Sequence, residues 1–215
     1  MSRDSAQPNI VFLHHSVGRQ LIATADLRAR LLASGIRLTD VDYNRLGTTG
    51  PEGERISAPP VPYDDTDIPA LADLLDRGGE FVDWLASFDV VVMKSCYPNS
   101  NLKTDSAALK QRQEVSRILS AASNRFRSFL WVTPPPLPPL RTSVAAARRA
   151  RDVALSSSST ASHVMVFDLH GSLADDAGML SRQFRRINPL DAHPNKLGAL
   201  SAGRELGTAP TLVDG

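Results

Sequence analysis

The chain has 215 residues, enough to bury one sizeable core, and its 24 Lys and Arg nearly balance its 23 Asp and Glu, so the formal net charge is +1. A nearly neutral chain creates no long-range field that would attract nucleic acid or an anionic membrane, so neither is expected as a partner. The single cysteine excludes an intrachain disulfide and a cysteine-rich metal cluster, and it fits a reducing cytoplasm.

Strand-like and helix-like stretches alternate along the chain. In chain order we expect a strand over 9–13, a helix over 17–32, a strand over 36–43, a helix over 71–85 interrupted near Gly78, a strand over 88–93, a helix over 105–122, a strand over 126–132, a helix over 144–155, a strand over 163–169 and a helix over 195–206. Five apolar strands separated by helices predict a doubly wound parallel sheet with helices on both faces, a three-layer α/β/α sandwich.

Two segments between these elements have unusual compositions. Residues 44–67 are rich in Gly, Pro and acidic residues and show no hydrophobic period, so they are expected to form a loop. A loop of this length often has a function, and we expect one here. Residues 133–140 contain five prolines and are expected to form an extended surface connection. We expect one domain over 1–215, with flexible ends at 1–8 and 208–215.

The ends of the chain and its hydropathy predict where the protein works. Residues 1–8 are polar and do not resemble the start of a signal peptide. No uninterrupted apolar run reaches the roughly 18 residues that a membrane span needs. We therefore expect a soluble, cytoplasmic protein.

Ser16 directly follows the first expected strand, in the segment H-H-S-V-G. In doubly wound sheets reactive groups gather beyond the carboxyl ends of the strands, and the helix that follows offers backbone N–H groups to an oxyanion. Ser16 is therefore a candidate nucleophile. The alternative is an ordinary helix N-cap, and the two roles can coexist.

His193 lies just before the last expected helix, in the segment D-A-H-P-N. A nucleophilic serine needs a base to take its proton, and that base needs an acid to orient it. His193 is the candidate base, and Asp191, two residues earlier, is the candidate acid. The alternative for His193 is a surface histidine in a turn.

Four features occur in order along the chain: a serine after the first strand, a glycine after the second, a polar loop with asparagine after the third, and a late acid-His-Pro segment. This pattern resembles the SGNH (GDSL-like) hydrolase superfamily. The resemblance covers nearly the whole chain. It implies a flavodoxin-like sandwich and the activity of an esterase, lipase, thioesterase or carbohydrate deacetylase. By this resemblance the oxyanion donors are the backbone N–H groups of Ser16 and Gly47 and the side chain of Asn99, with Asn101 as second choice. Each of these loop residues could instead serve a turn.

The sequence departs from that family's pattern at three places. The usual Gly-Asp-Ser is replaced by His14-His15-Ser16, the Gly-x-Asn-Asp block is absent, and Leu190 stands where the acid normally does, three residues before the histidine. A non-catalytic member of the family is therefore an open alternative.

The sequence leaves open the roles of three residues near the candidate site. His15 could contact substrate or tune Ser16, or it could be structural. Lys94, at the end of an apolar strand, could hold an anionic substrate group or an acidic side chain, or it could be a solvated strand-end lysine. Cys96 could be a nucleophile, although a small packing residue is the commoner role.

The sequence thus predicts acyl transfer from a small ester or an acylated metabolite or sugar to Ser16, without a cofactor or metal. The adjacent residues His14 and His15 give no metal site, because they point to opposite faces and no third ligand is evident. The alternatives are an acyltransferase on the same site and a non-catalytic binding protein. No glycine-rich phosphate loop follows the first strand, so a nucleotide-binding module is disfavoured.

Overall fold

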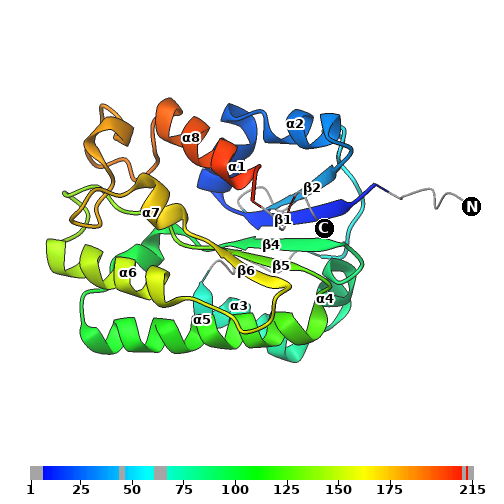
Figure 1. Ribbon diagram of the computed structural model, residues 1–215, viewed down its shortest axis with the longest axis horizontal. Coiled ribbons are helices and arrows are strands. Elements are labelled where there is room, and N and C mark those ends of the chain that lie inside the picture. Colours follow the sequence, from blue (N-terminus) through cyan, green and yellow to red (C-terminus); the bar gives the residue numbers. More distant parts are fainter. Residues whose placement is uncertain (1–6, 44–46, 61–66, 210–211, 213–215) are drawn as a thin grey trace, which may run out of the picture.

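A computed structural model describes residues 7–43, 47–60, 67–209 and 212 (Figure 1). Most of the expected flexible ends, and parts of the 44–67 segment, lie outside the described residues.

The described strands form one sheet of six, in the order β3-β2-β1-β4-β5-β6. Every neighbouring pair is parallel except β2 and β3, which are antiparallel. The bounds are β1 (Asn9–His14), β2 (Arg37–Asp42), β3 (Gly47–Thr49), β4 (Val90–Lys94), β5 (Phe129–Val132) and β6 (Val164–Phe167). The doubly wound prediction is confirmed, with one strand more than the five expected. The extra strand, β3, has only three residues, too few to give a periodic signal.

Helices cover both faces of the sheet, as expected (Figure 1). They are α1 (Ser16–Thr24), α2 (Leu27–Ala33), α3 (Ile68–Arg77), α4 (Glu80–Leu85), α5 (Asp105–Arg125), α6 (Val144–Ser156), α7 (Leu169–Leu173) and α8 (Lys196–Leu206), with 3₁₀ turns η1 (Tyr97–Ser100) and η2 (Arg182–Phe184). Successive strand residues point to opposite faces, so Phe12 packs in the core under α1 and α8 while Leu13 packs in the core over α3 and α5. The inner strands β1, β4 and β5 are buried on both faces, which explains their unbroken apolar runs.

Several element boundaries differ from expectation, and for two of them the structure shows a local cause. The single helix expected over 17–32 is two helices, because Asp26 adopts a left-handed conformation with φ of 50°. The strand expected over 163–169 ends at Phe167, and Asp168 caps α7 by accepting from the Gly171 N–H at 2.9 Å. The interruption near Gly78 is confirmed, since Gly78 and Gly79 both have positive φ.

The proline-rich segment is not a surface connection, and that prediction is wrong. Residues 134–138 are buried. The Pro135 carbonyl accepts from Ser100 Oγ at 2.7 Å, and the Leu137 carbonyl accepts from the Leu180 N–H at 2.9 Å. A proline has no N–H to satisfy, so a run of prolines whose carbonyls are bonded can be buried at little cost.

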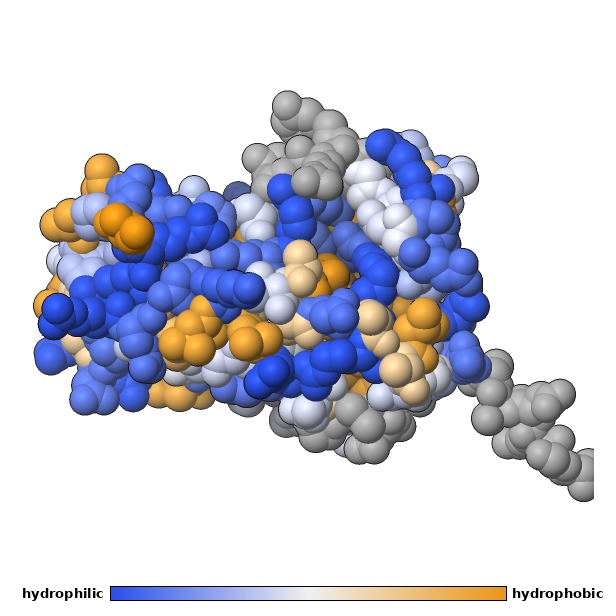
Figure 2. Space-filling model, turned by 90° about the horizontal axis from the view of Figure 1, so that it is seen from above, coloured by the Kyte–Doolittle hydropathy of each residue, from blue (hydrophilic) through white to orange (hydrophobic). Residues whose placement is uncertain are grey.

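The outer face over α1, α2 and α8 is largely hydrophilic, with apolar side chains in small separate groups (Figure 2). No described helix is long and apolar enough to cross a membrane.

Candidate active site

Ser16 and His193 come from opposite ends of the chain and meet beyond the carboxyl end of β1. Ser16 is the first residue of α1, and the N-cap position belongs to His15, so the alternative that Ser16 is an ordinary N-cap is wrong. His193 lies in the segment that leads into α8. Helices α1 and α8 pack closely where Gly203 faces Leu21, and a Cβ on Gly203 would lie 3.0 Å from the Leu21 carbonyl oxygen. This close contact holds the two ends of the chain together.

The serine, histidine and aspartate side chains form a connected line. His193 Nε2 lies 2.7 Å from Ser16 Oγ, and His193 Nδ1 lies 2.7 Å from Asp191 Oδ1. The same Asp191 oxygen accepts from the His193 backbone N–H at 2.9 Å. This turn explains how an acid only two residues before the histidine reaches its ring.

The pKa of Asp191 lies below its ordinary value. Partial burial raises this pKa, but the hydrogen bonds from the backbone and ring of His193 and the charges of His193 and Arg186 lower it by more. Asp191 therefore stays ionised and holds the proton of His193 on Nδ1, which leaves Nε2 as the acceptor facing Ser16.

Arg186 is a part of this arrangement that sequence reasoning missed. Its Nη1 lies 3.2 Å from Asp191 Oδ2, and its Nε donates to the Pro194 carbonyl at 3.2 Å. Gln20 of α1 donates to the same carbonyl at 2.9 Å. These bonds tie the segment that carries Asp191 and His193 to α1 and to the residues after η2. Arg186 follows the short 3₁₀ turn η2 in a stretch without a period, so no sequence signal pointed to it.

A small cavity of about 320 Å³ opens at the pair. It is lined by Ser16, Arg19, Gln20, Ala23, Thr24, Arg186 and His193. The ring of Tyr97 meets that of His193 edge to face, with centroids 6.1 Å apart, and Arg141 lies over Tyr97 at 5.4 Å. Sequence analysis did not single out Tyr97, which follows β4 in the same loop as Asn99.

The residues expected as further oxyanion donors lie near this edge of the sheet but not in that cavity's lining. Gly47 begins β3, in register with Asp42 of β2, and it lines a neighbouring cavity. The Asn99 side-chain amide donates to Ser95 Oγ at 2.8 Å. The Asn101 side-chain oxygen accepts from Thr142 Oγ1 at 3.3 Å. Their roles as donors stay predictions.

His14 and His15 point to different surroundings, as expected for neighbours at a strand end. The half-buried ring of His15 stacks on Tyr43, with centroids 5.7 Å apart. The fully buried ring of His14 lies 2.9 Å from the His15 carbonyl through Nδ1 and 3.2 Å from Asp40 Oδ2 through Nε2. Both ring nitrogens therefore contact polar groups of neighbouring residues, one on the backbone at the turn and one on β2. His14 thereby holds the turn that presents Ser16.

Lys94 and Cys96 are both buried, so the alternative of a solvated strand-end lysine is wrong. Lys94 Nζ donates to the Ser95 carbonyl at 2.6 Å. Burial lowers the pKa of Lys94 to about 8, an effect that Cys96 partly offsets. Neither side chain is among those lining the cavity at Ser16. Within the described ranges, no group of three or more His, Cys, Asp or Glu side chains could hold a metal ion.

No family model and no curated protein matches the sequence. Solved structures do match the fold. A protein of the G-D-S-L family from Desulfitobacterium hafniense has a TM-score of 0.53 at 11% identity, covering 93% of this chain and 97% of that one. A lipase/acylhydrolase from Enterococcus faecalis has a TM-score of 0.53 at 14% identity, and the match covers 95% of each chain. An acetylxylan esterase from Geobacillus stearothermophilus has a TM-score of 0.50 at 13% identity, and the match covers 98% of this chain and 96% of that one.

Proposed function

From the SGNH-hydrolase fold that this chain has, we propose that the protein is a serine hydrolase that cleaves a small ester or an acylated metabolite or sugar through an acyl-enzyme on Ser16. One observation carries the proposal: the continuous line of hydrogen bonds from Ser16 Oγ through His193 to Asp191, with 2.7 Å at each side of the ring. That line is the arrangement that activates a serine hydroxyl.

In the proposed first half-reaction, Ser16 Oγ attacks the acyl carbon while His193 Nε2 takes its proton. Asp191 stabilises the imidazolium that forms and does not itself become protonated. The tetrahedral intermediate then collapses, His193 returns the proton to the departing alcohol, and the acyl group stays on Ser16. In the second half-reaction water replaces the alcohol, and His193 repeats the same two proton transfers to release the acid.

Backbone N–H groups support the proposal at the position where negative charge develops. The Ser16 N–H belongs to the first residue of the nine-residue helix α1, so it lies at the positive end of the helix dipole. We assign it as the first oxyanion donor, with the Gly47 N–H and the Asn99 amide as the proposed second and third.

The test is hydrolysis of short-chain p-nitrophenyl esters by wild type, Ser16→Ala and His193→Ala, with fluorophosphonate labelling located by mass spectrometry. Either substitution should lower kcat by at least about 10³-fold, since the two groups act as a unit. The label should fall on Ser16. Ser34→Ala and His163→Ala are matched controls away from the site, and both should retain wild-type rates.

Wild-type protein that neither turns over any ester nor takes the label would contradict the hydrolase proposal and favour a non-catalytic binding protein. Labelling of Ser16 with acyl transfer to an added alcohol, but little hydrolysis, would favour the acyltransferase alternative.

A further inference from the structure

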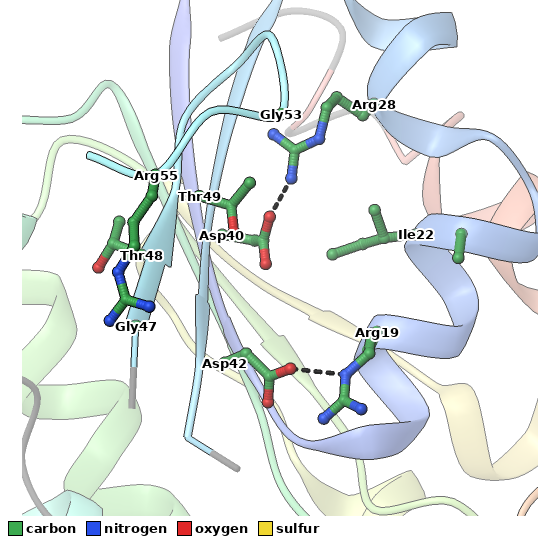
Figure 3. A pocket seen from close by; sticks show the side chains of 11 residues that line it. Arg19, Ile22, Arg28, Asp40, Asp42, Gly47, Thr48, Thr49, Gly53 and Arg55 are labelled. Atoms are coloured by element: carbon green, nitrogen blue, oxygen red, sulfur yellow. Dashed lines mark hydrogen bonds and ion pairs between the residues drawn. The ribbon is translucent and has the colours of Figure 1, made fainter. Parts of the chain in front are cut away.

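Two further cavities adjoin the one at Ser16, and they lie on different sides of α1. The second cavity, of about 300 Å³, lies between α1, α2, β2 and β3 (Figure 3). The third cavity, of about 680 Å³, lies between α1 and residues 185–196. Each shares part of its lining with the cavity at Ser16, so each is open to a part of the substrate that does not react.

The second cavity contains its own carboxylates, and they are already paired. Arg28 of α2 donates to Asp40 of β2 (Figure 3). Arg19 of α1 donates to Asp42 of the same strand at 2.6 Å. Arg55, the third arginine of the lining, is exposed. An anion entering this cavity would meet two buried carboxylates, and a cation would meet guanidinium groups, so the cavity offers little to a charged ligand.

The third cavity has a different balance of charge. Its lining contains three cations, Arg185, Arg186 and Lys196, and one carboxylate, Asp191. Both oxygens of that carboxylate are occupied. Oδ1 accepts from the His193 backbone and lies 2.7 Å from its ring, and Oδ2 lies 3.2 Å from Arg186. Within the lining, Asp191 therefore offsets only one of the three cations.

The other two cations keep most of their charge for a ligand. Arg185 Nη2 lies 3.5 Å from Asp175 Oδ2, longer than a charge-assisted hydrogen bond, and its Nε donates to the Leu180 carbonyl at 2.7 Å. Lys196 is exposed, and it forms no ion pair with any residue that the structure describes. Lys196 also begins the 11-residue helix α8, so the positive end of that helix dipole lies at the same end of the cavity.

This positive charge is local. Residues 182–196 carry four cations and one carboxylate, whereas the whole chain has a formal net charge of +1. The rest of the chain is therefore slightly acidic, and a small anion is drawn to this edge of the protein. Ile187, which also lines the cavity, has a fully exposed side chain and adds an apolar surface beside the cations.

The position of His193 decides which part of the substrate enters the third cavity. In the proposed mechanism its Nε2 returns the proton to the departing alcohol, so the alcohol part lies on this side of the ester. Gln20, Thr24 and Arg186 line both the cavity at Ser16 and the third cavity. Ser16, Gln20 and Thr24 are four residues apart along α1, so they form one stripe that is roughly 12 Å long. An alcohol with one ring and one anionic group fits along this stripe.

We infer that the third cavity binds the alcohol part of the substrate, and that this part carries a carboxylate or a phosphate held by Arg185 and Lys196. The inference rests on the proposed hydrolase function for the ester end. The anion site stands on the charges of the cavity alone.

The kinetic test compares acetate esters that differ in the charge of the alcohol. They are 4-acetoxybenzoate, 4-acetoxyphenyl phosphate and the neutral 4-acetoxybenzamide, and each kcat/KM is divided by the rate of alkaline hydrolysis of that ester. Wild type should prefer at least one anionic ester over the neutral one by about 5-fold, the size expected for a charge pair at an exposed site. The preferred ester tells a carboxylate from a phosphate.

Lys196→Gln should bring the ratio of anionic to neutral ester close to 1. Lys110→Gln, which removes an exposed lysine of α5, is the matched control and should keep the wild-type ratio. A ratio near 1 in wild type, or a wild-type ratio in Lys196→Gln, would overturn the inference.

A binding test separates this inference from the proposed catalysis. Ser16→Ala protein is titrated with benzoate, phenyl phosphate and benzamide, and binding is followed by saturation-transfer NMR. At least one anion should bind more tightly than benzamide, and adding Lys196→Gln should weaken its binding by about 5-fold. Anions that bind no better than benzamide would overturn the anion site even if Ser16 proves to be the nucleophile. Anion binding that depends on Lys196, in a protein without esterase activity, would support the anion site and contradict only the hydrolase proposal.

Discussion

Replacing Lys94 by Met is expected to stabilise the protein at neutral pH. The Lys94 ammonium is buried at the end of the central strand β4, and burial lowers its pKa from 10.5 to about 8. The folded protein thus binds this proton more weakly than the unfolded chain does. At about 1.4 kcal/mol per pKa unit, the charged lysine costs about 3 kcal/mol of folding free energy at pH 7.

The direction of the pH dependence follows from proton binding. Between pH 8 and 10.5 the unfolded chain carries more protons at this site, so the free energy of unfolding of the wild type rises with pH in that window. Lys94→Met removes the charge and also the hydrogen bond to the Ser95 carbonyl, which is worth about 1 kcal/mol. The variant should therefore be more stable by about 2 kcal/mol at pH 7, and this advantage should shrink by about 2 kcal/mol towards pH 9.5.

Urea unfolding followed by tryptophan fluorescence measures both quantities, because Trp131 is fully buried. Lys110→Met, which removes an exposed lysine, is the matched control and should show no such pH-dependent difference. A difference between wild type and Lys94→Met that is the same at both pH values would refute the reasoning, since the cost would then not come from the buried charge.

Three further predictions concern positions around the site. Gly18→Ala should destabilise the protein by about 1–3 kcal/mol in thermal unfolding, because the new Cβ would lie 2.2 Å from the Cβ of His14. Asp168→Ala should cost about 1–2 kcal/mol in urea unfolding, since it removes the cap on the Gly171 N–H, and an equal stability would contradict that role. Asp191→Asn should lower the free energy of unfolding by about 1 kcal/mol near pH 6. Because the folded-state pKa of Asp191 is lowered, this difference should disappear as the pH falls below 3.8. A difference that persists in acid would show that the charge of Asp191 is not its cause.

The sequence alone determined the architecture, a doubly wound parallel sheet with helices on both faces. Apolar runs of four to six residues between periodic stretches predict a parallel sheet because strands buried on both faces need apolar side chains on both. Local spacing also indicated that Asp191 could orient His193, and position after a strand singled out Ser16. The three residues of β3 gave no periodic signal, and the proline-rich composition of residues 133–140 led to the wrong prediction of a surface connection.

Only the tertiary structure decided which distant residues meet. The 2.7 Å contact between Ser16 and His193 joins positions 177 residues apart, and it depends on how α1 packs on α8. The clamp of Arg186 on Asp191 and the burial of Lys94 likewise depend on loops without a period. The second cavity brings Asp40 and Asp42 of one strand against arginines of two helices. Hydropathy and spacing record which face of an element is buried, but they do not record which charged partner lies across from it, and that is decided by packing.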